Sequence, residues 1–187
     1  MSMTAIWIIV AVVIIVVAAG WYAFQQRRSK ALRARFGPEY DYAVREYGGR
    51  STAENALAAR QRRIEKFHIR SLSSEDSRRF SERWHEVQTH FVDDPDASIV
   101  DADSLVCDLM KARGYPMSEF ESRAEDLSVD HPHVVRNYRA AHAIALRREK
   151  GEVDTEDLRQ ALIYYRDLFD DLLETRATIG SRETHRV

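Results

Sequence analysis

The stretch "TEDLRQALIYYRDLFDDLLET", residues 155–175, decides the fold class of the C-terminal part of this 187-residue chain. Its apolar residues recur at alternating intervals of four and three positions, which is the spacing of one face of an α-helix. The residues on this face are Leu158, Leu162, Tyr165, Phe169 and Leu172. The stretch therefore predicts one long amphipathic helix that packs a single side against other helices.

The segment 74–91 has the same kind of pattern, with apolar residues at intervals of four, three and four. Ser73 precedes it, with Asp76 three positions on, and a serine oxygen at this place can accept a hydrogen bond from a free amide of the first turn. The segment predicts a second amphipathic helix. Its apolar face consists of Phe80, Trp84, Val87 and Phe91.

Two further helices are expected over about 96–113 and 131–150, each followed by a glycine that suits a helix end. The capping box of Ser118 and Glu121 starts a short connecting helix to about Leu127. No segment alternates with a period of two for long enough to predict a strand. We predict an all-α fold, with a small antiparallel helical bundle over 71–176 and a disordered tail over 177–187.

The N-terminal stretch "AIWIIVAVVIIVVAAGWYAF", residues 5–24, contains no charged residue. Twenty helical residues span about 30 Å, the thickness of the hydrocarbon core of a bilayer. Trp7 lies near one end, and Trp21 and Tyr22 lie near the other, where aromatic side chains favour the membrane interface. We predict a transmembrane anchor over 1–26. A cleaved signal peptide is the alternative, because the small residues of "VVAAG" would suit a peptidase.

Residues 27–70 predict a basic juxtamembrane segment of short helices. The anchor helix should continue to about Phe36, where Gly37 and Pro38 break it and start a second helix. After two more glycines, Ser51 and Glu54 have the spacing of a capping box and predict the start of a third helix.

Charge is divided unevenly along the chain. Residues 27–70 hold 12 basic and 5 acidic residues, a net charge of +7, and residues 71–187 have a net charge of −9. A basic segment beside a membrane binds anionic lipid headgroups, and lysine and arginine favour the cytoplasmic side. We expect a single-pass protein of the cell membrane, with its N-terminus outside and its C-terminal domain in the cytoplasm. The residues predicted to contact the lipid surface are Arg27, Arg28, Lys30, Arg33 and Arg35.

Histidine pairs suggest metal sites at first sight, but their spacing is wrong for one. In "DHPH", residues 130–133, the proline suits the first turn of a helix, so we interpret His131 as a helix cap beside Asp130. His133 and His142 are nine positions apart and point to opposite sides of a helix. His85 and His90 are five apart, whereas a zinc-protease motif needs four. We predict no metal and no cofactor.

Other candidate groups also favour structural roles. Asp108 follows Cys107 and would raise the pKa of the thiol, which disfavours a catalytic cysteine. The aspartates of 93–103 lack the glycine and the final glutamate of a calcium loop. The acidic distal part has no basic stripe and disfavours nucleic-acid binding. We therefore predict no catalytic residue.

Most of residues 37–175 resembles a family of bacterial proteins that pair one membrane span with a helical domain and sometimes carry the name of secreted proteins. The resemblance rests on "FVDDPDASIVDADSLVCDLMKARGYPMSEFESRAEDLSVDHPHVVRNYRAAHAIA" and "DTEDLRQALIYYRDLFDDLL". It implies the anchor and the helical fold, and it implies no catalytic or binding residue. The charge pattern places the domain on the cytoplasmic side instead of outside the cell.

These features favour a membrane-anchored helical domain that acts by contact with a protein partner. Two alternatives stay open. The first is a membrane-tethered hydrolase whose histidines and acids are assembled by the fold, and it needs a concave site where such groups converge. The second is a sensor of anionic lipid surfaces, in which the basic segment is the active part.

Overall fold

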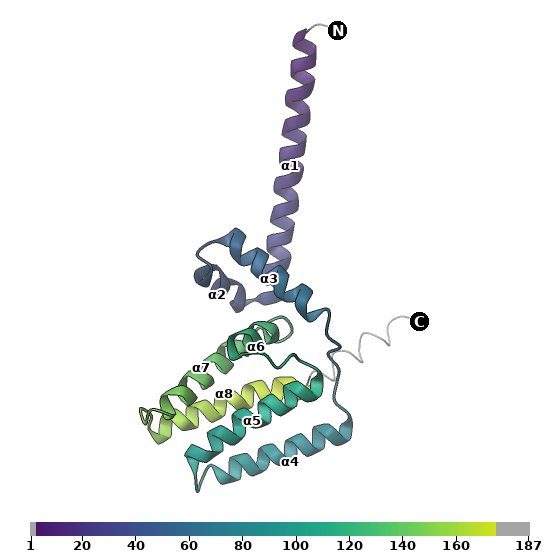
Figure 1. The fold of residues 1–187 in the computed structure, drawn as a ribbon. Coiled ribbons are helices and arrows are strands. Elements are labelled where there is room, and N and C mark those ends of the chain that lie inside the picture. The colour runs from purple at the N-terminus through teal and green to yellow at the C-terminus, as the bar shows by residue number, and fades with distance from the viewer. Residues whose placement is uncertain (1–2, 175–187) are drawn as a thin grey trace. The chain divides into compact units, whose positions relative to one another are not determined.

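The computed structural model of this protein describes residues 3–174, and the tail predicted to be disordered lies outside them. Eight helices and no strand occur in this part of the chain, which confirms the all-α prediction. The chain divides into two compact units, Met1–Leu57 and Ala58–Val187. Figure 1 shows the helices of each unit.

The first unit contains α1 (Met3–Phe36), α2 (Pro38–Glu46) and the first half of α3 (Arg50–Ile64). α1 ends where the sequence predicts. Gly37 then takes a positive φ of 47°, which glycine adopts without strain, and Pro38 begins α2. The side chains of Phe36, Tyr40 and Ala53 are buried.

The predicted anchor is only partly covered by this description. The side chains of residues 1–6 and 8–11 lie outside the described part of the chain. Among the side chains that are described, no helix is long and apolar enough to cross a membrane.

The second unit contains the rest of α3 and five further helices. Figure 1 shows that α4 and α5 run in opposite directions, as do α7 and α8, and that α5 and α8 lie side by side. This arrangement confirms the predicted helical bundle. The helices are α4 (Ser74–His90), α5 (Pro95–Arg113), α6 (Phe120–Leu127), α7 (Val135–Arg148) and α8 (Thr155–Glu174).

The core of the second unit contains the apolar faces that the sequence predicts. Trp84 of α4 stacks on Phe169 of α8, with 4.7 Å between ring centroids. Tyr165 and Leu172 of α8 are almost fully buried. Leu162, on the same face, is only half-buried. The alternating pattern of 155–175 therefore identified the buried face of α8.

Local contacts confirm two predicted helix ends. The oxygen of Ser73 accepts a hydrogen bond from the amide of Asp76 at 3.0 Å, so Ser73 caps α4. Gly114 ends α5 in the left-handed conformation, with a φ of 91°. Its amide and that of Tyr115 bond the last carbonyls of the helix, as a C-terminal glycine allows.

Three predicted caps are wrong. α3 begins at Arg50, so Ser51 lies inside the helix and does not precede it. α6 begins at Phe120, with Glu119 rather than Ser118 at the cap position. α7 begins at Val135 behind Val134, so His131 does not cap it. At the starts of α3 and α7, a side-chain contact with a distant helix replaces the predicted cap.

Candidate functional site

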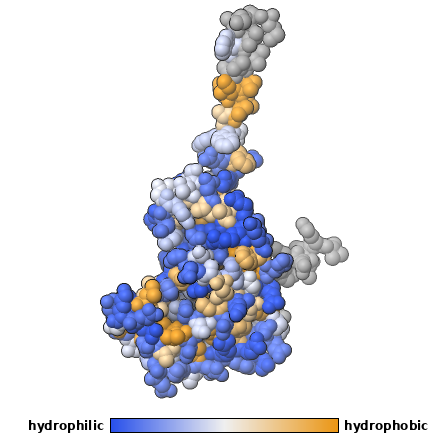
Figure 2. All heavy atoms as spheres, viewed as in Figure 1, coloured by the Kyte–Doolittle hydropathy of each residue, from blue (hydrophilic) through white to orange (hydrophobic). Residues whose placement is uncertain are grey.

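α1 presents apolar side chains to the outside from Val12 to Phe24. Described residues of this stretch are more than half exposed, from 53% for Val12 to 70% for Trp21. Figure 2 shows hydrophobic residues gathered on this helix. They include consecutive positions, Val12 to Val17, and therefore surround the helix instead of forming one stripe.

The five predicted lipid-surface residues lie on the second half of α1, and all of them are exposed. Arg28 donates a hydrogen bond to Asn55 at 3.1 Å, and Arg33 forms an ion pair with Asp41 at 2.9 Å. For Arg27 and Lys30, the described part of the chain contains no recorded partner. Arg35, in contrast to Arg27 and Lys30, does interact with another group. The five residues therefore differ in their contacts, although all of them are exposed on the second half of α1.

A buried polar cluster joins the three helices of the first unit. The carboxylate of Glu54 on α3 accepts hydrogen bonds at Oε1 from Ser29 of α1, at 2.5 Å, and from Tyr40 of α2, at 2.7 Å. Nε of Arg50 donates to the same oxygen at 3.0 Å and to the Tyr40 hydroxyl at 3.1 Å. One buried carboxylate oxygen therefore holds residues from α1, α2 and α3 together.

The hydrogen bonds fix the charge state of this cluster. Burial by itself raises the pKa of the Glu54 carboxyl, but the hydrogen bonds from Ser29, Tyr40 and Arg50 outweigh it and lower the pKa below its ordinary value. Burial and the bond to Glu54 raise the pKa of the Tyr40 hydroxyl. Glu54 is therefore ionised and Tyr40 is neutral at physiological pH.

An open pocket of about 320 Å³ lies beside the cluster, between α1 and α3. Each residue that lines it carries a polar group, although the stems of the long side chains and the ring of Tyr22 also contribute apolar surface. The residues that line it are Tyr22, Gln25, Gln26, Ser29, Arg50, Ser51 and Glu54. The pocket thus begins where the apolar stretch 5–24 ends, and it contains one cationic and one anionic side chain.

One spacing on α1 points to this cluster. Ser29, Leu32 and Phe36 are spaced three and four apart and share one face of α1, and all three are buried. A serine on a buried helix face needs a hydrogen-bond partner. Glu54 is the hydrogen-bond partner of Ser29, although the spacing of Glu54 from Ser51 predicts a capping box.

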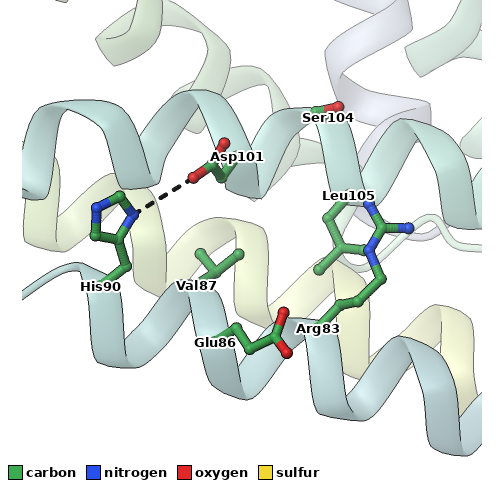
Figure 3. Close-up of a pocket in the computed structure, with 7 residues that line it drawn as sticks. All are labelled: Arg83, Glu86, Val87, His90, Asp101, Ser104 and Leu105. Carbon is green, nitrogen blue, oxygen red and sulfur yellow. Dashed lines mark ion pairs between the residues drawn. The ribbon is translucent and has the colours of Figure 1, made fainter.

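A second hollow, of about 380 Å³, lies between α4 and α5 of the helical unit. Figure 3 shows Arg83, Glu86, Val87 and His90 on one helix facing Asp101, Ser104 and Leu105 on the other. Nδ1 of His90 lies 3.6 Å from Asp101, and both side chains are about half exposed. An exposed ion pair of this kind contributes little stability. It is better explained as a contact between α4 and α5 than as a catalytic pair.

His131 lies in a different place from the predicted cap. Its ring is buried, and Nδ1 contacts the carboxylate of Asp171 on α8. Asp130 beside it accepts a hydrogen bond from Tyr115 at 3.1 Å. Nε2 of His131 is buried with no hydrogen-bond partner among the described residues. A histidine and an aspartate are thus paired as in hydrolases, but the free nitrogen is closed to substrate.

Cys107 and His142 lie at a polar cluster inside the helical unit. Burial and the charge of Asp103 raise the pKa of the Cys107 thiol, and Arg123 and Tyr138 offset only part of this. The direction agrees with the prediction, although burial rather than Asp108 is the main cause. His142 stacks on Phe120, with 3.6 Å between ring centroids, and burial lowers the pKa of its imidazole.

No group of three or more histidine, cysteine, aspartate or glutamate side chains in the described part of the chain is placed to hold a metal ion. Comparison of the chain with protein-family models, with curated proteins and with solved structures returned no match. The resemblance to bacterial single-span proteins stays a prediction, and the geometry of this chain is the basis for its function.

Proposed function

We propose that this chain is a single-pass membrane protein, anchored by the first half of α1, that presents its helical domain to a protein partner at the membrane surface. The observation that carries the proposal is the exposure of apolar side chains all round α1, from Val12 to Phe24. Water is a poor solvent for such a helix, whereas a bilayer is a good one. The uncharged stretch 5–24 has the length that a bilayer requires.

The exposed basic residues that follow this stretch support an orientation. Lysine and arginine next to a membrane span favour the cytoplasmic side. The proposal accordingly puts residues 27–187 in the cytoplasm and the N-terminus outside. Arg27 and Lys30 are exposed, and beside an anionic membrane surface each would contribute about 1 kcal/mol of attraction.

The helical domain supplies the surface for a partner. Its net charge of −9 over 71–187 repels an anionic membrane, so this part favours partners away from the lipid. Leu146 on α7 and Ile163 on α8 are exposed to 46% and 37%, and these two helices pack together. We propose these two side chains as contacts for the partner.

A pair of reporter fusions tests the orientation. One reporter is active only in the cytoplasm and the other only outside, and each is joined after Val187. The cytoplasmic reporter should be active and the exported one silent. Strong activity of the exported reporter would contradict the proposal. Reversal of Arg27, Arg28, Arg33 and Arg35 to glutamate should shift activity toward the exported reporter.

Cross-linking of the full chain in its own membrane tests the partner. A specific cross-linked protein should be recovered with the unchanged chain and lost in Leu146→Glu and Ile163→Glu. Val92→Glu is the matched control, because Val92 is 82% exposed and lies outside α7 and α8. A hydrolase screen is the counter-test. Turnover that His131→Ala abolishes, with no protein cross-linked, would favour the hydrolase alternative.

A further inference from the structure

We propose that the pocket between α1 and α3 binds the phosphoethanolamine headgroup of a membrane phospholipid. This inference rests on the proposed membrane anchor, which fixes the depth of the pocket. Gln25 to Ser29 follow the apolar stretch directly and extend about 8 Å beyond it at 1.5 Å per residue. The headgroup layer on each side of a bilayer is about 5–8 Å thick. The pocket therefore opens at the level of the headgroups.

Arg50 supplies the contact for the phosphate. Its Nε is occupied by Glu54 and Tyr40, and this fixes the direction of the guanidinium. The side chain is 66% exposed, and its two terminal nitrogens have no recorded partner in the described part of the chain. A guanidinium held in place with two free donors matches the geometry of a phosphate. The amides of Gln25 and Gln26 line the same pocket.

Glu54 supplies the contact for the ammonium group. The hydrogen bonds recorded for its carboxylate within the described residues all reach Oε1, which leaves Oε2 as an acceptor. A primary ammonium group donates hydrogen bonds to such an oxygen, whereas the trimethylammonium of a choline headgroup has no proton to donate.

The charges of the pocket select a zwitterion. Glu54 repels a ligand that is only anionic, and Arg50 repels one that is only cationic. Arg50 and Glu54 already pair with each other at 3.0 Å, and a headgroup with one phosphate and one ammonium adds an opposite charge beside each of them. The volume of about 320 Å³ lies at the lower end of the range for ligand pockets and suits a small polar group.

The test uses the full chain in detergent micelles, with bound lipid counted by native mass spectrometry. Phosphatidylethanolamine, phosphatidylcholine and phosphatidylglycerol are titrated separately. The ethanolamine lipid should bind about tenfold more tightly than the choline lipid, because a hydrogen bond to a charged group is at stake. Equal binding of these two lipids, or tighter binding of phosphatidylglycerol, would overturn the proposal. Soluble phosphoethanolamine should bind more weakly than the lipid, and equal affinity would exclude the lipid as the intended ligand.

Three variants locate the site. Glu54→Gln keeps the size of the side chain, removes its charge and should abolish the preference for ethanolamine over choline. Ser51→Trp fills the pocket without removing a member of the Glu54 cluster, and it should reduce ethanolamine-lipid binding about tenfold even if Glu54→Gln unfolds the unit. Arg45→Gln is the matched control, since Arg45 is an exposed arginine of α2 outside the pocket. It should keep the full preference.

The two proposals fail in different ways. Membrane insertion of the full chain should be unchanged in Glu54→Gln and Ser51→Trp, because neither residue lies in the apolar stretch. If the unchanged chain inserts but shows no headgroup preference, the pocket assignment is wrong and the anchor stands. If the preference persists in both pocket variants, the lipid binds elsewhere and the assignment is equally wrong.

Discussion

Trp84 is a residue whose truncation should cost the helical unit a large part of its stability. Its indole is 5% exposed and stacks on Phe169 with 19° between the ring planes. Trp84→Ala would leave a cavity between α4 and α8 and should lower the free energy of unfolding by about 3–5 kcal/mol. Denaturant unfolding of the full chain in a mild detergent measures this. Val92→Ala, at a highly exposed position, should stay within about 0.5 kcal/mol, and a similar small loss for Trp84→Ala would show that the stack is not formed.

His142 should make the stability of the helical unit fall in mild acid. Burial lowers the pKa of its imidazole below the usual 6.5, and the charge of Asp103 offsets only part of this. As the pH falls through about 6.5, the unfolded chain therefore takes up a proton before the folded chain does. Stability attributable to His142 is present above this range and is lost as the pH falls toward the folded-state pKa.

The variant His142→Phe isolates this effect, because phenylalanine keeps a ring beside Phe120 and does not titrate. The loss of unfolding free energy between pH 7.5 and pH 5 should be smaller in His142→Phe than in the unchanged chain. His133→Ala changes an exposed histidine and should leave the loss as it is. The same pH dependence in all three proteins would contradict the assignment.

Residue patterns predicted burial well and polar contacts poorly. The face of Phe80, Trp84 and Val87 is buried as its spacing indicates, because helical periodicity alone fixes which side chains share a side. Glu54 and His131 were interpreted as helix-start residues, yet each contacts a residue of another helix, Ser29 and Asp171 respectively. Such partners lie 25 and 40 positions away, and no local spacing encodes them.

At the scale of elements, Gly114 is the helix end that a side chain would disturb most. Its φ of 91° disfavours other residues, and a Cβ there would lie 2.7 Å from the carbonyl oxygen of His68. Gly114→Ala should therefore lower the free energy of unfolding by more than about 1 kcal/mol. Gly151 is the matched control, because its φ is also positive, at 71°, but nothing lies within 4 Å of the added atom.

The difference between the two alanine variants in denaturant unfolding measures the cost of the His68 contact alone. Gly151→Ala should show only the smaller backbone cost. Equal losses in both variants would mean that the backbone at His68 moves aside at little cost. The close approach of His68 to Gly114 would then not help to hold α5 in place.

Helix ends marked by glycine or proline were predicted closely, whereas ends marked by a serine were not. Pro38 restricts the backbone, and Gly37 and Gly114 let it take a positive φ, so their effect does not depend on distant residues. Ser51 lies inside α3, and Ser118 stands one position before the residue at the cap position of α6. Only Ser73, which is itself exposed, caps its helix as expected.

At the scale of the whole molecule, the sequence predicted the helical bundle because each long segment has one apolar face that needs a covering. The polar cluster of the first unit was not predicted, since it depends on how three short segments meet around Glu54. The proposed anchor follows from a different property, the absence of charge over residues 5–24, which is visible without any fold.

Extraction of membranes with alkaline carbonate tests the anchor most directly. The unchanged chain should stay with the membrane pellet, because a spanning helix resists release. The double variant Ile14→Arg and Val17→Arg places two charges near the middle of the stretch, at about 2.5–3.5 kcal/mol each, and should move to the supernatant. Release of the unchanged chain, or equal retention of the double variant, would contradict the account.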